Sequence, residues 1–267
     1  MAYEFFAIER QDDTATLWLN RPEKRNAMNR AFWNELPQAM EELRADEGVR
    51  AIVLAGRGKD FTVGLDLKDM LGSITEDAGR GKFHFLEEVD RLQKAISSVA
   101  DCPKPVIAAV QGWCLGGGID LITACDIRYA SANTVFSIRE TKIAIVADVG
   151  TLQRLPAIIG KGHVAELAFT GDDIDAAYAE KIHLVNRVFP DPDATLAGAR
   201  ELAARIAANS PLAVQGTKMV LDFCEGKSVE DGLRYVGTWN AAFLKSDDLG
   251  EAMAAFVEKR KPKFKGR

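Results

Sequence analysis

Two turns that carry glycine are the first features of this chain that could do chemistry. Gly116, Gly117 and Gly118 stand in succession between a buried apolar run and a segment that continues like a helix, and Gly64 follows an earlier buried run. Three successive glycines are costly in chain entropy, so another group is expected to approach the backbone closely there. If the two turns face each other, the N–H groups of Leu65 and Gly117 can converge on one carbonyl oxygen. A tight turn that serves packing alone is the alternative.

Three carboxylates follow the glycine run and are candidates for proton transfer. Asp120 comes two residues after it, Glu140 follows the β-like segment TVFSIR, and Asp148 lies within the apolar string IAIVADVG. The neighbours of Asp148 place it on a buried surface, where the loss of hydration raises the pKa of a carboxyl group toward neutrality. The structural alternative for Asp148 is the N-cap of a helix over VGTLQRL. Asp126 is expected to take part in a structural ion pair.

Other catalytic systems are not represented in the sequence. There is no GxSxG or HExxH motif, neither a P-loop nor a dinucleotide fingerprint is present, and the four cysteines form no CxxC pair. The three histidines stand singly, without the spacing that is typical of a zinc site. What remains is acid and base chemistry by carboxylates beside backbone N–H donors, which suits the formation and reprotonation of an enolate or dienolate.

Length and charge narrow the class of protein. A chain of 267 residues, 47% of them hydrophobic, can bury a core without disulfides, metals or a partner. The formal net charge of -5 argues against a general nucleic-acid binder, which normally has a basic surface. Acidic residues near the N-terminus interrupt any signal-like apolar run, and no apolar stretch is long enough for a membrane span. We therefore expect a cytoplasmic protein without nucleic-acid or membrane partners.

Short apolar runs predict the strands that must position these residues. Some of the runs are continuous, which suits strands buried on both faces, and others are rich in β-branched and aromatic residues. The predicted strands cover residues 14–19, 51–56, 105–110, 127–131 and 134–138. The third of them leads into the glycine run, so that strand, glycines and helix follow one another there.

Apolar residues that recur at spacings of three and four predict helices over 32–44 and 83–100. Pro37 is a candidate break in the first of these helices, and a flexible loop is expected over 76–82. From Thr151 onward the pattern is mainly helical. The order of elements indicates an α/β core followed by a helical C-terminal part.

Five segments together resemble the crotonase, or enoyl-CoA hydratase/isomerase, superfamily over nearly the whole chain. They are NRPEKRNAMN at 20–29, FTVGLDL at 61–67, CPKPVIAAVQGWCLGGGIDLITACDIRYA at 102–130, ADVGTLQRLP at 147–156 and EKRKPKFKGR at 258–267. The resemblance implies an α/β fold in which ββα turns form a spiral core over 1–200. It also implies a C-terminal helical region over 201–267 that completes a homotrimer or, doubled, a homohexamer.

The resemblance implies an acyl-CoA thioester as the substrate. Coenzyme A would be part of that substrate, so no separate cofactor and no metal is expected. The thioester oxygen would lie in an oxyanion hole formed by the N–H groups of Leu65 and Gly117, which agrees with the convergence considered above. The residues that the resemblance places near the substrate are Lys24, Arg25, Ala27, Lys59, Val63, Gly64, Asp66, Lys68, Trp113 and Gly116.

The acidic residues separate the reactions within the superfamily. In the hydratases the positions of Asp120 and Glu140 are both glutamates, which together activate a water molecule. The aspartate at 120 and the further acid Asp148 make this chain resemble the dienoyl-CoA isomerases, which convert a 3,5-diene into a 2,4-diene. The resemblance then implies that Asp148 removes the proton alpha to the thioester and that Glu140 delivers one at the far end of the diene. Asp120 would tune the site.

Two alternatives stay open, and four positions depart from the isomerase pattern. The alternatives are a 2-enoyl-CoA hydratase and a catalytically silent member that binds acyl-CoA or RNA, the latter encouraged only by the basic tail KRKPKFKGR. Lys142 stands where the isomerases usually have aspartate, and Ala144 where they have glycine. Val63 and Trp113 are bulkier than expected beside the oxyanion turn, so they bear on the length of acyl chain that fits.

Overall fold

The computed structural model describes residues 3–69 and 82–267, and a six-stranded sheet forms its centre. The strands follow the order β1 (Phe6–Gln11), β2 (Thr14–Leu19), β3 (Ala51–Gly56), β4 (Val106–Val110), β6 (Ile127–Ser131) and β9 (Arg187–Phe189). β1 and β2 form an antiparallel hairpin, and all later neighbours are parallel. Every residue of β3 and β4 is buried, as expected of continuous apolar runs in a sheet that is covered on both faces.

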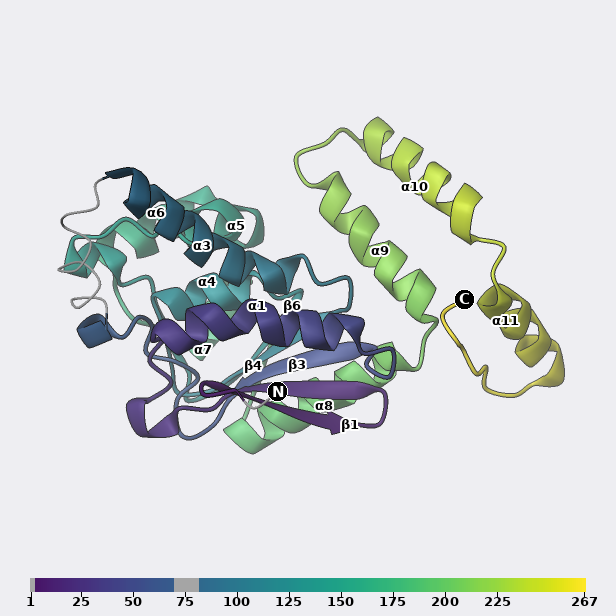
Figure 1. Ribbon diagram of the computed structural model, residues 1–267, viewed down its shortest axis with the longest axis horizontal. Coiled ribbons are helices and arrows are strands. Elements are labelled where there is room, and N and C mark those ends of the chain that lie inside the picture. The colour runs from purple at the N-terminus through teal and green to yellow at the C-terminus, as the bar shows by residue number, and fades with distance from the viewer. Residues whose placement is uncertain (1–2, 70–81) are drawn as a thin grey trace.

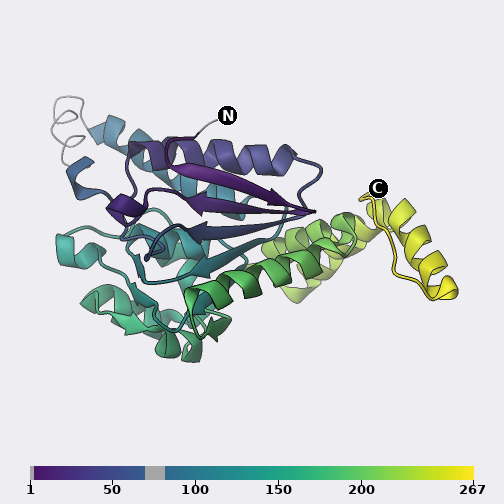
Figure 2. The same ribbon diagram turned by 90° about the horizontal axis from the view of Figure 1, so that it is seen from below.

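Helices cover both faces of this sheet (Figures 1 and 2). α1 (Arg30–Ala45) and α3 (Lys82–Ala100) pack against each other on one face, and α8 (Pro192–Ala207) crosses the other. Pro37 does not interrupt α1, whose apolar face stays buried along its length. The fully buried Ala199 of α8 packs against β3 and β4, since a small side chain lets the helix lie close to the sheet.

A smaller sheet brings the two glycine turns together. Its strands are β5 (Trp113–Leu115), β7 (Val135–Ser137) and β8 (Ile174–Asp175). β5 is parallel and β8 antiparallel to β7. An isolated bridge from Thr62 to Cys114 connects β5 with the turn that contains Gly64. α4 (Gly117–Thr123) begins directly after the glycine that follows β5, so the start of this helix lies beside that turn.

The chain ends in a helical arm. Further helices are η1 (Pro22–Lys24), η2 (Glu140–Ile143), α5 (Thr151–Ile159), α6 (Lys161–Thr170), α7 (Ala176–Lys181), α9 (Pro211–Cys224), α10 (Val229–Phe243) and α11 (Asp247–Glu258). The last three extend away from the sheet, and we call residues 211–267 the C-terminal arm (Figures 1 and 2). Its basic tail is not a free end, because Arg50 donates to the Phe264 carbonyl at 2.9 Å and Asp248 accepts the N–H of Lys265 at 2.7 Å.

The expected α/β core with a helical C-terminal part is confirmed. The predicted strands and helices agree with the observed ones to within two residues at each end. The pattern did not predict β1, β5, β8 and β9. Of these, β5 is a separate short strand before the glycine run, which pairs with β7 and which the pattern did not distinguish from the turn. Residues 76–81 of the expected flexible loop lie outside the described residues. The expected division at residue 200 falls within α8 and stays a prediction.

Candidate active site

The two glycine turns are in contact. Gly64 has a φ of +83°, and a Cβ atom there would lie 2.7 Å from the Leu115 carbonyl oxygen and 3.5 Å from the Gly117 nitrogen. The left-handed conformation and the close approach both require glycine at this position. Met28 holds the turn from the other side, because its N–H donates to the Gly64 carbonyl at 2.8 Å and its carbonyl accepts the Asp66 N–H at 3.0 Å.

This contact brings two free backbone donors close to each other. Gly117 is the first residue of α4, so its N–H has no acceptor within the helix. Leu65 follows Gly64 directly in the chain. Within residues 3–69 and 82–267, neither the Leu65 N–H nor the Gly117 N–H forms a hydrogen bond. Both donors are therefore available to an oxygen atom of a ligand where the turns meet.

Asp120 joins α4 to the start of α5. The residue is 1% exposed, and its Oδ1 accepts a hydrogen bond of 2.6 Å from the Thr151 N–H. Its Oδ2 is buried and has no hydrogen-bond partner among the described residues. Burial raises the pKa of Asp120 to about 6, against the opposing effect of the bonds with Thr151. This carboxyl group therefore changes its protonation close to neutral pH.

Glu140 opens the 3-10 turn η2 and places its carboxyl group over the glycine run. Oε1 lies 3.3 Å from the position that a Cβ atom on Gly116 would take. Oε2 is buried and, among the residues described, unpaired. Burial is the largest cause of a rise in the pKa of Glu140 to about 7, and the charges of Asp120 and Asp148 add to it. Glu140 therefore holds a proton at a higher pH than an ordinary glutamate does.

Asp148 lies on the segment between η2 and α5. It is half-buried, and burial raises its pKa above the ordinary value. Its carbonyl oxygen accepts a hydrogen bond of 2.6 Å from Gln93 Nε2, which ties the segment to α3. The N-cap of α5 is Gly150, which supplies no side-chain hydrogen bond. The helix-cap alternative for Asp148 is therefore wrong, since the capping oxygen comes from Asp120.

The three carboxyl groups form one electrostatic cluster. The charge of Asp148 raises the pKa of Asp120, and the charges of both raise the pKa of Glu140. Acids that interact in this way share protons, so that one member is charged while another stays protonated. Beside two N–H donors, such a cluster can take a proton from one carbon of a bound molecule and return a proton to another. In the described part of the chain, no group of three or more His, Cys, Asp or Glu could hold a metal ion.

The basic residues expected near a substrate differ in the exposure of their side chains and in the contacts that they make within the protein. The ones with exposed side chains are Lys24, Lys59 and Lys68. Arg25 is instead engaged within the protein, because its Nε donates to the buried Asp60 at 2.7 Å. Its guanidinium group also lies over the ring of Trp113, 5.6 Å from the centroid. In the described part of the chain the side chains of these three lysines have no hydrogen bond or ion pair, whereas that of Arg25 has both.

Arg21 holds the residues around the Gly64 turn, and the sequence did not indicate it. Its Nη1 donates to Asp66 Oδ2 at 2.7 Å and to the Ala27 carbonyl at 2.9 Å. The half-buried Val63 donates its N–H to the Arg25 carbonyl at 3.2 Å. The turn is thus fixed from the 21–28 segment. Arg21 lies in the NRPEK motif, but nothing in its spacing points to Asp66.

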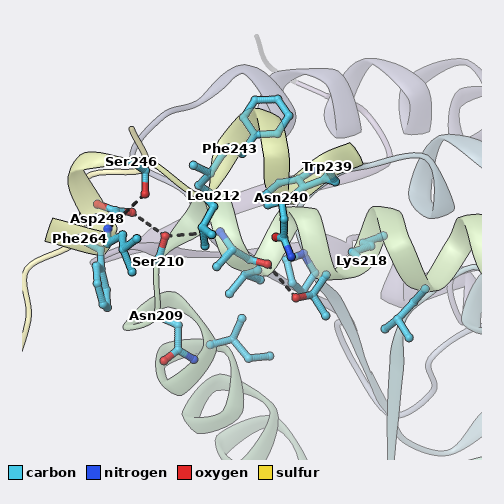
Figure 3. Close-up of a pocket in the computed structure, with 18 of the residues that line it drawn as sticks. Asn209, Ser210, Leu212, Lys218, Trp239, Asn240, Phe243, Ser246, Asp248 and Phe264 are labelled. Carbon is cyan, nitrogen blue, oxygen red and sulfur yellow. Dashed lines mark hydrogen bonds between the residues drawn. The ribbon is translucent and has the colours of Figure 1, made fainter. Parts of the chain in front are cut away.

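A cavity of about 760 Å³ lies apart from the acidic cluster (Figure 3). It opens between the C-terminal arm and one end of the main sheet, and none of the three carboxylates of the cluster lines it. Lys218 Nζ donates to Asp126 at 2.9 Å at its wall, so the expected structural ion pair of Asp126 is confirmed. Large apolar side chains that line the cavity include Leu212, Trp239, Phe243 and Phe264.

Comparison with known proteins gives one consistent family. A family model described as enoyl-CoA hydratase/isomerase matches residues 9–267. The chain is 45% identical to a mitochondrial Delta(3,5)-Delta(2,4)-dienoyl-CoA isomerase of Dictyostelium discoideum, over 98% of this chain and 92% of the relative. It is 43% identical to a peroxisomal Delta(3,5)-Delta(2,4)-dienoyl-CoA isomerase of Arabidopsis thaliana, over 98% of each chain. The crystal structure of an enoyl-CoA hydratase from Bacillus anthracis matches with a TM-score of 0.90 and 31% identity, over 99% of this chain and 100% of that one.

These comparisons confirm two expectations and correct a third. The crotonase-like fold and the similarity to dienoyl-CoA isomerases are confirmed. The expectation of a cytoplasmic protein is wrong, since the relatives at 45% and 43% identity are named mitochondrial and peroxisomal. That expectation was based on the lack of a signal-like apolar run and of a membrane-spanning stretch, and neither of these absences identifies a compartment. Over residues 3–69 and 82–267, no helix has the length and apolar character that crossing a membrane requires.

Proposed function

This chain belongs to the enoyl-CoA hydratase/isomerase family, and we propose that it is a dienoyl-CoA isomerase, which moves the double bonds of a 3,5-dienoyl-CoA to the 2,4 positions. The observation that carries the proposal is the third acid, Asp148, which lies half-buried and raises the pKa of both Asp120 and Glu140. Two acids that act on one water molecule suffice for hydration, whereas a proton shift between distant carbons needs acids at two separate places, and Asp148 supplies the second place. The relatives with 45% and 43% identity support the same reaction.

Asp148 acts as the base of the first step. Its carboxylate takes a proton from C2 of the substrate, the carbon next to the thioester. The electron pair of the broken C–H bond forms a C1=C2 double bond, and the carbonyl pair moves onto the thioester oxygen. The N–H groups of Leu65 and Gly117, which have no other acceptor among the described residues, donate to this oxyanion. The C3=C4 and C5=C6 double bonds extend the conjugation to the far end of the diene.

Glu140 acts as the acid of the second step. Its pKa of about 7 lets it keep a proton at neutral pH while Asp148 is charged. The oxygen pair re-forms the carbonyl group, the double bonds shift to C2=C3 and C4=C5, and C6 takes the proton of Glu140. One proton has then passed to Asp148 and another has left Glu140, so a proton must return from the first to the second before the next turnover.

Asp120 and the surface lysines complete the proposal. Asp120 tunes the site, because its charge raises the pKa of Glu140 and its bond to Thr151 fixes the end of the segment that carries Asp148. Coenzyme A is part of the substrate, and its phosphates are multiply charged anions that suit ammonium groups. The exposed lysines that serve them are Lys24, Lys59 and Lys68. The two steps move only protons, so we propose no separate cofactor.

We further propose that the chain works as a homotrimer or homohexamer. Large apolar side chains of the C-terminal arm are exposed, among them Leu233, Met253, Phe256 and Val257. Several large apolar side chains exposed on one arm are typical of a protein–protein interface. Sedimentation equilibrium tests this: a mass of three or six chains supports the proposal, and a monomer contradicts it.

Ultraviolet spectroscopy tests the reaction. The purified protein is mixed with a 3,5-dienoyl-CoA and, separately, with a 2-enoyl-CoA of matched length. Forming a diene conjugated to the thioester raises the absorbance, whereas hydrating an enoyl thioester lowers it. We expect a rise with the first substrate and little change with the second. A fall with the second and no change with the first would instead identify a hydratase, and no change with either would contradict both enzymatic functions.

A further inference from the structure

Two guanidinium groups contact the ring of Trp113. Cζ of Arg139 lies 5.3 Å from the ring centroid, and Cζ of Arg25 lies 5.6 Å from it. Each arginine also has a carboxylate partner. Arg139 donates to Asp173 Oδ1 at 2.5 Å, and Arg25 donates to Asp60 Oδ2 at 2.7 Å. The indole therefore connects the 21–28 segment with the turn η2.

The carboxyl group of Glu140 is held by no other side chain among those described. Oε2 is buried and unpaired, and Oε1 packs over Gly116, which has no side chain to hold it. Among the residues that the structure describes, the backbone N–H groups of Arg139 and of Glu140 itself favour its charged form. The position of this carboxyl group is therefore decided by the backbone of η2. Contacts that hold η2 in place therefore also hold the carboxyl group of Glu140 in place.

Side chains on both sides of Glu140 fix the turn. Thr141 Oγ1 donates to the Ala168 carbonyl at 2.9 Å and anchors the turn to α6. On the other side Arg139, the N-cap residue of η2, is half-buried, and its Nε is buried without a hydrogen-bond partner among the described residues. Its guanidinium group thus depends on the ring of Trp113 and on Asp173. A guanidinium group over an indole ring is a favourable arrangement.

We propose that Arg139, held against the ring of Trp113, is a positioning residue that keeps the carboxyl group of Glu140 over the glycine run. This rests on the proposed function, in which Glu140 returns the proton to the far carbon of the diene. The proposal also explains why a large side chain stands at position 113, because the ring of Trp113 supports Arg139 in addition to lying beside the glycine turn. Neither side chain touches the reacting atoms in this proposal, and both act through Glu140.

The test compares Trp113→Leu and Arg139→Met with the conservative changes Trp113→Phe and Arg139→Lys. We expect kcat for a 3,5-dienoyl-CoA to fall about 10- to 100-fold in the first two variants while KM changes little, because a misplaced acid slows the chemical step. The alkaline limb of the pH profile is expected to move to lower pH in Trp113→Leu, since a carboxyl group that turns toward water loses the burial that raises its pKa. Trp113→Phe keeps a ring face and is expected to recover most of kcat.

Trp18 offers a matched control for these variants. Its ring also lies under two guanidinium groups, those of Arg57 and Arg200, each 5.6 Å from the centroid. Trp18 lies on β2 of the main sheet, away from the glycine turns. Trp18→Leu removes the same kind of contact, and we expect kcat and the pH profile to stay as in the wild type. An equal loss of kcat in this control would overturn the proposal, because it would show that lost stability, not position, slows the enzyme.

Two further results separate this proposal from the proposed function. A rise in KM with an unchanged kcat in Trp113→Leu would overturn the positioning role and make the ring a substrate contact. Crystal structures of Trp113→Leu and Arg139→Met give an answer that needs no turnover: we expect the carboxyl group of Glu140 to leave its place over Gly116, and an unmoved carboxyl group overturns the proposal. A wild type that fails to convert the diene would contradict the proposed function, while the crystal structures would still decide the role of Arg139.

Discussion

Asp120 Oδ1 accepts a hydrogen bond of 2.6 Å from the N–H of Thr151, the first residue of α5. The bond supplies a cap that Gly150, at the N-cap position, cannot provide. The start of a helix favours a charged carboxylate, yet burial acts in the opposite sense and raises the pKa of Asp120 to about 6. One side chain thus fixes the segment that carries Asp148 and keeps a second oxygen, unpaired among the residues described, buried within the acidic cluster.

Asp120→Asn is therefore expected to stabilise the fold at neutral pH. The pKa of Asp120 is about 6 in the folded protein and 3.8 without the fold, so the folded state binds the extra proton. Its contribution to stability is full below about pH 4 and is lost as the pH rises through about 6. The loss is about 3 kcal/mol for a shift of this size, and a neutral amide avoids it while still accepting the Thr151 N–H.

Urea unfolding of wild type and Asp120→Asn at about pH 4 and about pH 8 measures this difference. The free energy of unfolding of the variant, relative to that of the wild type, should be higher at about pH 8 than at about pH 4. The variant should also turn over more slowly, because Asp120 no longer raises the pKa of Glu140. A constant difference in stability across this range would show that the carboxyl group does not titrate as burial requires.

The local pattern of the sequence predicts the elements and the candidate acids, because both depend on near neighbours in the chain. The apolar residues around Asp148 indicate burial, and the structure has it half-buried. The same local pattern could not separate Asp148 from a helix cap, since the oxygen that caps α5 comes from Asp120 in another helix. The contact of the Gly64 turn with Gly117 likewise joins distant segments, so the residues raised it only as a condition and the family resemblance was needed to expect it.

For the residues expected near the substrate, too, the sequence does not reveal contacts between distant segments, and Trp113 is an example. Its bulk is visible in the sequence, where it predicts an effect on the acyl chain. Its contacts with Arg25 and Arg139 join segments that are distant in the chain, so no spacing in the sequence indicates them. The Arg21 to Asp66 ion pair was missed for the same reason.

The rate of isomerisation is expected to pass through a maximum with pH. Glu140 must hold a proton, so kcat should fall as the pH rises past its pKa of about 7. Asp148 must be charged, so its raised pKa sets the loss of kcat on the acid side. Glu140→Gln has no proton to give, and we expect a loss of about 100-fold or more together with the alkaline limb. Initial rates measured across the pH range check this, and an alkaline limb that survives in Glu140→Gln would assign it to another group.

Asp148→Asn is expected to lower the rate of the diene shift by about 100- to 10,000-fold, because an amide cannot take the proton from C2. The half-buried side chain keeps its shape in this variant and loses a charge that burial disfavours, so the unfolding temperature should not fall. Asp193→Asn, an exposed aspartate in α8, is the control and should keep the full rate. The rise in ultraviolet absorbance with a 3,5-dienoyl-CoA measures both. If Asp148→Asn kept the full rate, another group would be the base.

Gly64→Ala should lose both stability and activity, since a Cβ atom at φ +83° would lie 2.7 Å from the Leu115 carbonyl oxygen. The strained backbone costs about 1 to 3 kcal/mol. That oxygen belongs to the backbone just before the glycine run, so relief of the overlap must move the turn away from α4 and displace the Leu65 N–H. The loss of one oxyanion donor lowers kcat by about 100- to 1,000-fold.

Gly162→Ala in α6 is the matched control, because a Cβ atom there meets nothing within 4 Å. In a helix this change is expected to stabilise the fold by about 0.5 to 1 kcal/mol and to leave kcat unchanged. Urea unfolding and the ultraviolet assay give both quantities for the two variants. A Gly64→Ala protein that loses stability but keeps the wild-type kcat would remove the Leu65 N–H from the mechanism, because the close contact of the two turns would then serve the fold alone.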